Sequence, residues 1–567
     1  MTSKAARGLV GFVPILTWIR QYRPGSLRGD VAGAATAWAI VVPESVAYAQ
    51  IAGVPPQNAF YAAPIALLAY AVFGSSRNLV VGATSAAAIL SASTVAEVSA
   101  NSKDAVELSA ALCLVAGVIL LAAGLLKLGF ITNFMSEPAL TGFLFGMALI
   151  IVIRQLGKIV GVSTGDGDFF ARLWHLLAHI GSWGGVSIVV GVIAIGALLA
   201  LERYLPKVPA SLVVLVLGIV LSYLLKLDHH GVEVVGKIPS SVPAPHVPNV
   251  SWHQVAQLTG GGFGLALVVF AESYSISSRF ARVHGYEVDA NQEMIAMGAS
   301  NLAVGFVRGF AVSGSASRTA AVDGAGGATQ MVSIVAAVLV LITAAFLTPL
   351  FTYLPEAVLA AMIIHAVSKL MKVAEMRRYY HLVRREFWLG MITLAGVITL
   401  DVLPGLVIGV VLSLLVLAYL ASRPVFSVMG AVPEVPGAYE DVRRHPRAKP
   451  VPGVLIIRPD APLFYANAKP LRDAVRRRLR SSAAPVDTLI LDLDGSDRLD
   501  VTSAEALAAV AADLAAAGVR LGLAHLHVHA ADLLRRAGAD GPGAGFRAFP
   551  TLDAAVRWAR PGQPAGR

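Results

Sequence analysis

The chain alternates long apolar runs with short polar connections over its first three quarters. A helix that crosses a lipid bilayer needs about 20 mainly apolar residues. Fourteen apolar runs occur, at 31–51, 58–74, 84–97, 107–127, 138–160, 182–202, 209–226, 261–278, 290–307, 318–323, 329–352, 355–371, 387–400 and 403–421. The third and the tenth are too short to cross alone, so the pattern predicts an α-helical polytopic membrane protein with two half-helices.

A different pattern follows residue 450. Apolar runs typical of buried strands, at 453–458, 486–493 and 519–525, alternate with helical stretches at 468–480, 504–517 and 530–537. Such alternation predicts a small α/β domain. We therefore expect an N-terminal cytoplasmic segment over 1–29, a transmembrane domain over 30–422, a Pro- and Arg-rich linker over 423–450 and an α/β domain over 451–567.

Composition supports this division. Charged residues are 14% and hydrophobic residues 56% of the 567, against about 25% charged in ordinary soluble domains, which excludes a single soluble globule. The net charge of +10 comes from the first 29 residues and the tail, and arginines that flank membrane spans explain it without a nucleic-acid partner. Cys113 is the only cysteine, which excludes a disulfide scaffold and a multi-cysteine zinc site.

The distribution of Lys and Arg predicts the orientation. With the N-terminus in the cytoplasm, the inner loops carry most of the basic residues, including the cluster at 369–385. An even number of spans then places the C-terminus in the cytoplasm as well. The apolar stretch 9–19 is short and contains Pro14, so we expect an interfacial helix there rather than a cleaved signal peptide. The expected location is the inner (plasma) membrane.

Two lone acids indicate an internal repeat. Glu44 precedes the first half-helix and Glu272 precedes the second, at similar distances along the chain. Seven spans in each half would turn the second half upside down, which gives a 7+7 inverted repeat. Paired broken helices in matching positions of two inverted halves are typical of a transporter's binding site. Each would point unpaired N–H groups and partial positive charge into the membrane, which favours an anion.

The residues at the two breaks carry the candidate chemistry. The second half-helix begins with Gly314, Ser315, Ser317 and Arg318, which supply close backbone approach, hydroxyl donors and a full positive charge. Serine could instead serve only as a helix cap. Arg318 favours an anion site, because charge inside a membrane is costly and usually functional. At the first half-helix, capping and ligand binding are both open for Thr84 and Ser85.

The two acids are candidates for ion coupling. Burial among apolar residues disfavours the charged form of Glu272, which makes it a candidate proton carrier. The alternative is a structural acid paired with a basic neighbour such as Arg318. Glu44 follows Pro43, which can break the first span, and could either line the site or take part in coupling.

Enzymatic functions find no support. The sequence has neither a phosphate-binding glycine loop with Lys-Ser/Thr nor a catalytic serine elbow, so we expect a non-enzymatic protein without a cofactor. His525, His527 and His529 alternate and could share one strand face, but no acid or cysteine with metal spacing lies beside them. We therefore interpret them as a strand end and expect no metal.

The motifs resemble a known family. The run Pro43–Pro56 resembles the first-span signature of the SulP anion permeases, the sulfate permease family, and the run Gly314–Thr319 matches its second half. The tail resembles a STAS domain. The resemblance implies core and gate domains, an elevator-like mechanism and a homodimer. It also implies an anion near Ser315, Ser317 and Arg318, with Ala83 and Thr84 opposite, and Glu272 as the coupling acid.

Three positions depart from the family pattern. Glu44 stands where many members have Gln, which adds a titratable group, and Ala83 stands where many have Pro. The run Asp500–Ser503 stands where phosphorylated STAS relatives have Asp-Ser-Ser-Gly, so the resemblance gives no support for phosphorylation at Thr502.

The residues and the resemblance together predict proton-coupled uptake of a small oxyanion, most simply sulfate, by a protein embedded in the lipid bilayer. Bicarbonate with sodium coupling and C4-dicarboxylates are alternative substrates, and Glu272, Ser273 and Ser275 could supply sodium ligands. A nucleobase permease is disfavoured because a neutral base needs no arginine. A non-transporting sensor is disfavoured because it need not keep the intramembrane acids.

Overall fold

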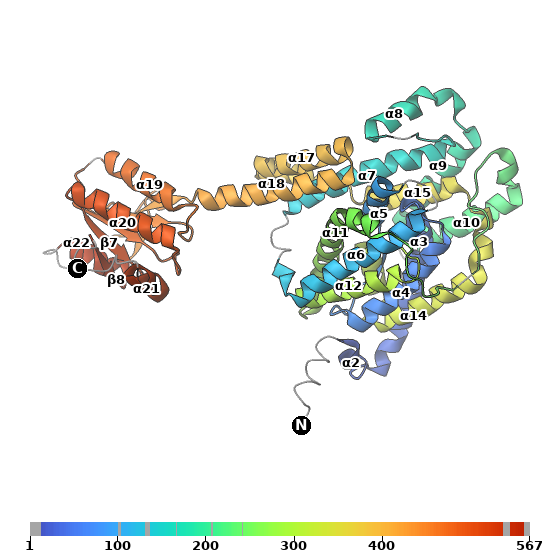
Figure 1. Ribbon diagram of the computed structural model, residues 1–567, viewed down its shortest axis with the longest axis horizontal. Helices are drawn as coiled ribbons and strands as arrows, with labels where there is room; N and C mark the ends of the chain where they lie inside the picture. The colour runs from blue at the N-terminus through green and yellow to red at the C-terminus, as the bar shows by residue number, and fades with distance from the viewer. Residues whose placement is uncertain are drawn as a thin grey trace. The chain divides into compact units, whose positions relative to one another are not determined.

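The computed structural model describes residues 13–99, 104–130, 136–165, 167–205, 208–240, 242–482, 484–536 and 545–560 (Figure 1). The chain divides into two compact units, Met1–Ser413 and Leu414–Arg567. The first is almost entirely helical, and the second holds a six-stranded sheet with helices.

Each half of the membrane region repeats one order of elements within the described residues. The first half runs α3 (Leu27–Ile51), α4 (Gln57–Phe73), β1 (Val81–Ala83), α5 (Ser85–Val98), α6 (Ala105–Leu125), α7 (Glu137–Val160), α9 (Gly185–Tyr204) and α10 (Ala210–Leu225). The second runs α11 (Trp252–His284), α12 (Ala290–Gly305), β2 (Val312–Gly314), α13 (Ala316–Gly324), α14 (Met331–Ile342), α15 (Glu356–Ser368), α17 (Arg384–Leu400) and α18 (Val402–Ser422). Each half thus has seven helices, with a short strand before the third.

Shorter elements lie outside this repeat: α2 (Ile15–Trp18), η1 (Pro24–Ser26), α8 (Phe169–Ala178), η4 (Ile180–Ser182), η5 (Leu227–His230), η6 (Thr343–Leu347), η7 (Thr348–Tyr353) and α16 (Val373–Leu382). The helix expected over 9–19 is limited to α2 in the described part, because residues 1–12 lie outside it.

The fourteen predicted segments are confirmed as helices. Eight helices in the described part of the chain are long and apolar enough to cross a membrane. The third and tenth are short, as expected, with 14 residues in α5 and 9 in α13. The main difference is α11, which spans 33 residues where the apolar run covers only 261–278, because a capping box at Ser251 starts it early and Gly285, at φ 68°, ends it late.

The helices pack in two groups. In the first, the core, α12 packs against α4 and α6, α14 against α3 and α4, and α11 against α5 and α6. In the second, the gate, α7 packs against α15 and α17, and α9 against α10 and α15. Small residues allow close contact: a Cβ on Gly298 of α12 would lie 2.7 Å from the backbone nitrogen of Leu121 on α6. The division into core and gate is the expected one.

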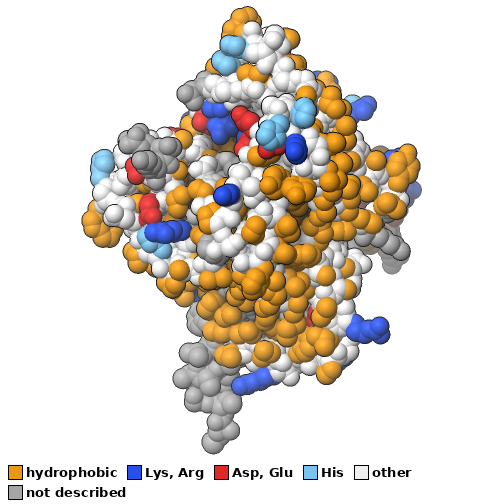
Figure 2. All heavy atoms as spheres, turned by 90° about the vertical axis from the view of Figure 1, so that its right-hand side faces the viewer, with side chains coloured by type: hydrophobic (Ala, Val, Ile, Leu, Met, Phe, Trp, Pro, Cys, Tyr) orange, Lys and Arg blue, Asp and Glu red, His pale blue; other side chains and the backbone are white. Residues whose placement is uncertain are grey.

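The outer surface of the helical unit is apolar where lipid would contact it. Figure 2 shows hydrophobic side chains over a broad area of one face, with most charged side chains lying away from it. On α9 and α10 the exposed side chains include Val192, Ile193, Leu221 and Leu224. A soluble protein rarely exposes so large an apolar surface, so these faces fit a bilayer. The chain is a multi-pass membrane protein.

The second unit is the α/β domain. Its sheet has the order β4-β3-β5-β6-β7-β8, with parallel pairing from β5 to β8 and antiparallel pairing of β3. The elements are β3 (Phe426–Ala431), β4 (Tyr439–Asp441), β5 (Val454–Pro459), α19 (Ala468–Arg480), β6 (Thr488–Asp492), α20 (Val501–Ala516), β7 (Arg520–Ala524), α21 (Val528–Arg536), β8 (Phe546–Phe549) and α22 (Leu552–Ala559). The three predicted strands and three predicted helices are confirmed.

The expected linker over 423–450 is wrong for this segment. β3 and β4 form there and belong to the sheet, and Met429 of β3 packs in an apolar core with Ile456 of β5. The segment is rich in proline, which is typical of a linker, and this composition led to the wrong prediction. In the structure, buried and partly exposed residues of β3 follow one another along the strand. β8 and α22 were also not predicted.

Candidate functional site

The two short strands meet in the middle of the membrane region. β1 and β2 pair antiparallel, with Val81 opposite Gly314 and Ala83 opposite Val312. The Ser315 N–H donates to the Val80 carbonyl oxygen at 3.1 Å, which extends the pairing by one hydrogen bond. Because each strand leads directly into a half-helix, this ladder brings the N-termini of α5 and α13 together from the two halves of the chain.

Buried side chains hold the ladder in place. The Asn301 amide donates to the Val312 carbonyl at 3.0 Å and accepts from the Val312 N–H at 3.1 Å. These are the two hydrogen bonds that a neighbouring strand would make with Val312. The Ser273 hydroxyl accepts from the Gly314 N–H at 2.9 Å, and the Thr319 hydroxyl accepts from the Val80 N–H at 3.1 Å. All three side chains belong to the second half, and they fix β2 and the residue that precedes β1.

The half-helices begin with caps that leave donors available. The Thr84 hydroxyl accepts from the Ala87 N–H, and the Ser315 hydroxyl accepts from the Arg318 N–H. The first N–H groups of a helix have no partner within the helix itself. Each end also carries partial positive charge, so two such ends at one place make it electropositive.

Arg318 adds a full positive charge at this point. Its side chain is fully buried, and Nη2 donates to the Ala83 carbonyl oxygen at 2.6 Å. Nε lies 3.6 Å from Oε2 of Glu44 on α3. Within the described part of the chain, neither Nε nor Nη1 has a hydrogen-bond partner. A buried charge is costly unless it is paired and hydrogen-bonded, so these two nitrogens suit an anion.

Gly82 makes room for the guanidinium. A Cβ at this position would lie 2.6 Å from Arg318 Nη1. Real Cβ atoms do not approach that closely, so any larger residue would displace the arginine.

Glu272, on α11, is bonded to β2. The Ser313 hydroxyl donates to Glu272 Oε2 at 3.1 Å and is 3.2 Å from the Ser273 hydroxyl. Among described residues, Glu44 rather than Glu272 forms the ion pair with Arg318. The alternative that pairs Glu272 with Arg318 is therefore wrong, and Glu272 is joined to the ladder through serine.

The candidate residues named from the sequence gather around the ladder. Ala83, Thr84, Ser85, Gly314, Ser315 and Arg318 are buried where α5 and α13 begin, and Ser317 is exposed with its hydroxyl 3.2 Å from that of Ser315. Sequence reasoning missed the roles of Gly82 and Asn301. Gly82 directly precedes Ala83 of the predicted site, but nothing in a sequence shows which side chain would meet a Cβ at this position.

The three histidines do not share a strand face. β7 ends at Ala524, His525 follows with φ 52° and contacts Asp492 at 2.8 Å through Nδ1, and His529 lies in α21. The described residues contain no group of three His, Cys, Asp or Glu side chains placed to hold a metal ion.

Comparison with known proteins gives a consistent result. A model of the Sulfate permease family matches residues 27–393, and a STAS domain model matches residues 445–555. The chain is 34% identical over 554 residues to a probable sulfate transporter of Mycobacterium tuberculosis, covering 96% of this chain and 98% of that protein. It is 30% identical over 499 residues to high affinity sulfate transporter 1 of Stylosanthes hamata, covering 85% and 74% respectively.

Solved structures agree with the fold. Murine Solute Carrier 26 family member A9, an anion transporter in the inward-facing state, superposes with a TM-score of 0.88 at 25% identity, covering 99% of this chain and 96% of that one. The transmembrane domain of the cyanobacterial bicarbonate transporter BicA gives a TM-score of 0.62 at 22% identity, covering 68% and 98%. The second similarity concerns the fold alone.

Proposed function

Because the chain belongs to the sulfate permease family, we propose that it is a secondary active transporter that takes up sulfate together with protons. The observation that carries the proposal is Arg318, a buried guanidinium between the starts of two half-helices, with two nitrogens that have no hydrogen-bond partner among the described residues. The family consists of transporters, so we propose a role in transport and not in catalysis for the residues at this site.

The donors at the site suit a tetrahedral oxyanion. A guanidinium presents several N–H groups in a fixed plane and can hold two oxygens at once. The hydroxyls of Thr84, Ser315 and Ser317 lie at the same helix ends and can serve further oxygens. Bicarbonate and C4-dicarboxylates remain alternative substrates, since both present planar oxyanions to the same donors.

Glu44 lowers the net positive charge at the proposed anion site. Its Oε2 is 3.6 Å from Arg318 Nε and has no hydrogen-bond partner among described residues. It therefore offsets part of the guanidinium charge. An incoming anion competes with this carboxylate, which favours a doubly charged solute over a singly charged one.

Glu272 is the proposed proton carrier. It accepts a hydrogen bond from Ser313, the middle residue of β2. The strand ends one residue later, at Gly314, and α13 follows. Protonation removes a negative charge close to the anion, so proton and anion binding would strengthen each other. A sodium site built from Glu272, Ser273 and Ser275 has less support, because Ser273 is already bonded to Gly314 and Ser275 is exposed.

The proposed movement is that of an elevator. β1, β2, α5 and α13, together with Glu44 on α3 and Glu272 on α11, all belong to the core group of helices. A shift of the core against the gate would thus carry the complete site. We further propose a homodimer in the plasma membrane with both termini in the cytoplasm.

Uptake in proteoliposomes tests the proposal. Purified protein would be supplied with labelled sulfate, bicarbonate or succinate, with an inward proton gradient, an inward sodium gradient or neither. We expect sulfate to accumulate only with the proton gradient. Glu272→Gln should lose this accumulation and keep sulfate exchange, whereas Glu97→Gln, at an exposed position of α5, should behave as wild type. Unchanged gradient dependence in Glu272→Gln would contradict the coupling role.

A further inference from the structure

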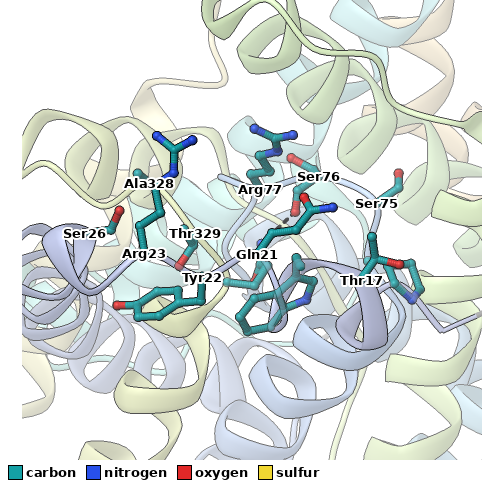
Figure 3. A pocket seen from close by; sticks show the side chains of 14 residues that line it. Thr17, Gln21, Tyr22, Arg23, Ser26, Ser75, Ser76, Arg77, Ala328 and Thr329 are labelled. Carbon is teal, nitrogen blue, oxygen red and sulfur yellow. Dashed lines mark hydrogen bonds between the residues drawn. The ribbon is translucent and has the colours of Figure 1, made fainter. Parts of the chain in front are cut away.

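A second basic site lies beside the beginning of α3. Three separate segments surround a cavity of about 850 Å³: 14–26, 74–77 and 328–330 (Figure 3). Its lining shares no residue with the transport site described above. The lining residues are Pro14, Thr17, Trp18, Gln21, Tyr22, Arg23, Ser26, Gly74, Ser75, Ser76, Arg77, Ala328, Thr329 and Gln330.

The cavity is positively charged. Arg23 and Arg77 line it, and no carboxylate does. Neither arginine forms an ion pair within the part of the chain that the structure describes. Arg77 is held in position instead, because its guanidinium lies 5.2 Å from the centre of the Tyr286 ring and its backbone N–H donates to the Tyr286 hydroxyl at 3.2 Å. In Figure 3 both guanidinium groups extend in the same direction.

Buried carboxylates fix the two loops that form the walls. Asp30 accepts hydrogen bonds from the N–H groups of Ala328 and Thr329, at 2.9 and 3.2 Å, and from the Thr329 hydroxyl at 2.7 Å. Glu293 accepts from the N–H of Ser75 at 3.0 Å and from its hydroxyl at 2.7 Å. Both acids are fully buried and accept several hydrogen bonds from these loops, so they hold the loops in place, and neither forms an ion pair with Arg23 or Arg77 in the described part of the chain.

The two loops are also tied to each other. The Gln330 amide donates to the carbonyl oxygens of Ser76 and Leu79, at 2.9 and 3.0 Å. The cavity is thus preformed, which lowers the entropic cost of binding a ligand.

The cavity lies at the level where membrane spans begin. Arg23 directly precedes the span Pro24–Ile51, and Arg77 follows the end of α4 at Phe73. Trp18 also lines the cavity, and its Nε1 donates to the Ala71 carbonyl at 3.1 Å. Tryptophan and tyrosine prefer the depth of lipid headgroups, so Trp18 and Tyr22 place the cavity there.

We infer that this cavity binds the phosphate group of an anionic phospholipid. Arg23 and Arg77 would hold the phosphate oxygens, and hydroxyls such as those of Ser75 and Thr329 would add further donors. Pro14 and Trp18 give the apolar wall that the glycerol and the start of the acyl chains require. Inorganic phosphate shares the charged chemistry but needs no apolar wall at headgroup depth, which favours the lipid.

Native mass spectrometry of the detergent-solubilised full-length protein tests the inference. The protein would be titrated with phosphatidylglycerol, phosphatidylcholine or inorganic phosphate. Wild type should bind one phosphatidylglycerol at least about tenfold more tightly than phosphatidylcholine, since each basic group adds attraction for anionic lipid. The double variant Arg23→Gln/Arg77→Gln should lose this preference. Arg20→Gln/Arg28→Gln, which removes two exposed arginines that lie near the cavity in the sequence but outside its lining, should keep it.

Two results would overturn the inference. One is an equal loss of preference in both double variants, which would mean that general basic charge attracts the lipid. The other is arginine-dependent binding of inorganic phosphate without any preference for phosphatidylglycerol, which would assign the cavity to a free anion. Melting behaviour equal to wild type shows that each variant is folded, because both arginines of the cavity are exposed.

Discussion

Nη2 of Arg318 donates to the carbonyl oxygen of Ala83 at 2.6 Å. Arg318 lies in the first turn of α13, and Ala83 lies two residues before the start of α5. This one bond connects the two inverted halves at the point where both helices are broken. Nε and Nη1 of the same guanidinium have no hydrogen-bond partner among the described residues, although Nε lies 3.6 Å from Glu44 Oε2. The proposed substrate site is therefore built from residues of both halves, and neither half contains it alone.

Removal of the arginine should weaken anion binding. Truncating one partner of a buried charge pair costs about 2–5 kcal/mol, so Arg318→Ala should lower sulfate affinity by at least about tenfold. Isothermal titration or scintillation proximity with labelled sulfate measures this.

The control for that variant addresses folding. Arg318→Ala leaves Glu44 buried without its ion pair, which is itself destabilising. The double variant Arg318→Ala/Glu44→Gln removes both charges and should fold better while still binding sulfate poorly. Wild-type affinity in this double variant would place the anion elsewhere.

A substitution that displaces the Arg318 guanidinium should weaken sulfate binding, as its removal does. Gly82→Ala adds a Cβ that would lie 2.6 Å from Nη1, so the guanidinium must move although every charge is kept. We expect sulfate affinity to fall at least about tenfold, which corresponds to 1.4 kcal/mol. Gly196→Ala on α9 is the matched control, because its Cβ would meet nothing within 4 Å. Equal affinities of the two variants would contradict the role of Gly82.

Neutralising Glu44 should strengthen anion binding. Its carboxylate competes with the anion for the guanidinium across 3.6 Å, and an amide of similar size competes less. We expect Glu44→Gln to bind sulfate several-fold more tightly and to keep its response to a proton gradient. Loss of that response, measured by uptake into proteoliposomes, would make Glu44 a coupling residue.

The ladder should depend on Asn301. Asn301→Leu keeps the volume but leaves the N–H and carbonyl of Val312 without these partners, at a cost of about 1–3 kcal/mol for each buried group. The melting temperature should fall and sulfate affinity should fall with it. Cys113 is buried and is the only cysteine, so a thiol-reactive fluorophore reports unfolding directly.

Ser300→Ala is the control for Asn301. The Ser300 hydroxyl is equally buried, and its one hydrogen bond to a described residue stays within its own helix, where it donates to the Ala296 carbonyl. Equal melting temperatures for the two variants would show that the amide does not hold β2.

The STAS domain should lose a stabilising contact in acid. Hydrogen bonds from Arg472 and Arg476 lower the pKa of Asp513 to about 2. A lowered pKa stabilises the fold above the unfolded pKa of about 4, and this contribution is lost as the pH falls from about 4 to 2. The pair is partly exposed, so we expect less than about 1 kcal/mol.

Urea unfolding of the soluble fragment 424–567 checks this contribution. Its stability at pH 6 should exceed that of Asp513→Asn, and most of this difference should be lost by about pH 2, the pKa of Asp513 in the folded state. A difference that is as large at pH 2 as at pH 6 would contradict the assignment.

The helices could be predicted because every backbone N–H and carbonyl group in lipid must be hydrogen-bonded within the protein. Each apolar run had to become a helix, and the shortness of α5 and α13 was visible directly in the sequence. Glu44, Glu272 and Arg318 stood out because charge inside a membrane is rare. What the sequence could not show was their pairing, since the ion pair between Arg318 and Glu44 joins residues 274 positions apart in opposite halves.

Other features depended on three-dimensional proximity. The strands β1 and β2 have three residues each, too few for any periodicity, and they exist because the halves meet. The basic cavity combines Arg23, Arg77 and Thr329 from three distant segments. β3 was obscured by a composition that resembles a linker, and only its pairing with β5 reveals it.

Localisation of a bound anion tests the central claim most directly. Selenate has the shape and charge of sulfate, and its anomalous scattering in a crystal of the full-length protein gives its position. We predict a selenium peak between the first residues of α5 and α13, close enough to Arg318 for a selenate oxygen to accept a hydrogen bond from Nη1. A well-occupied peak elsewhere in the membrane region, with no density between these helix ends, would contradict the account.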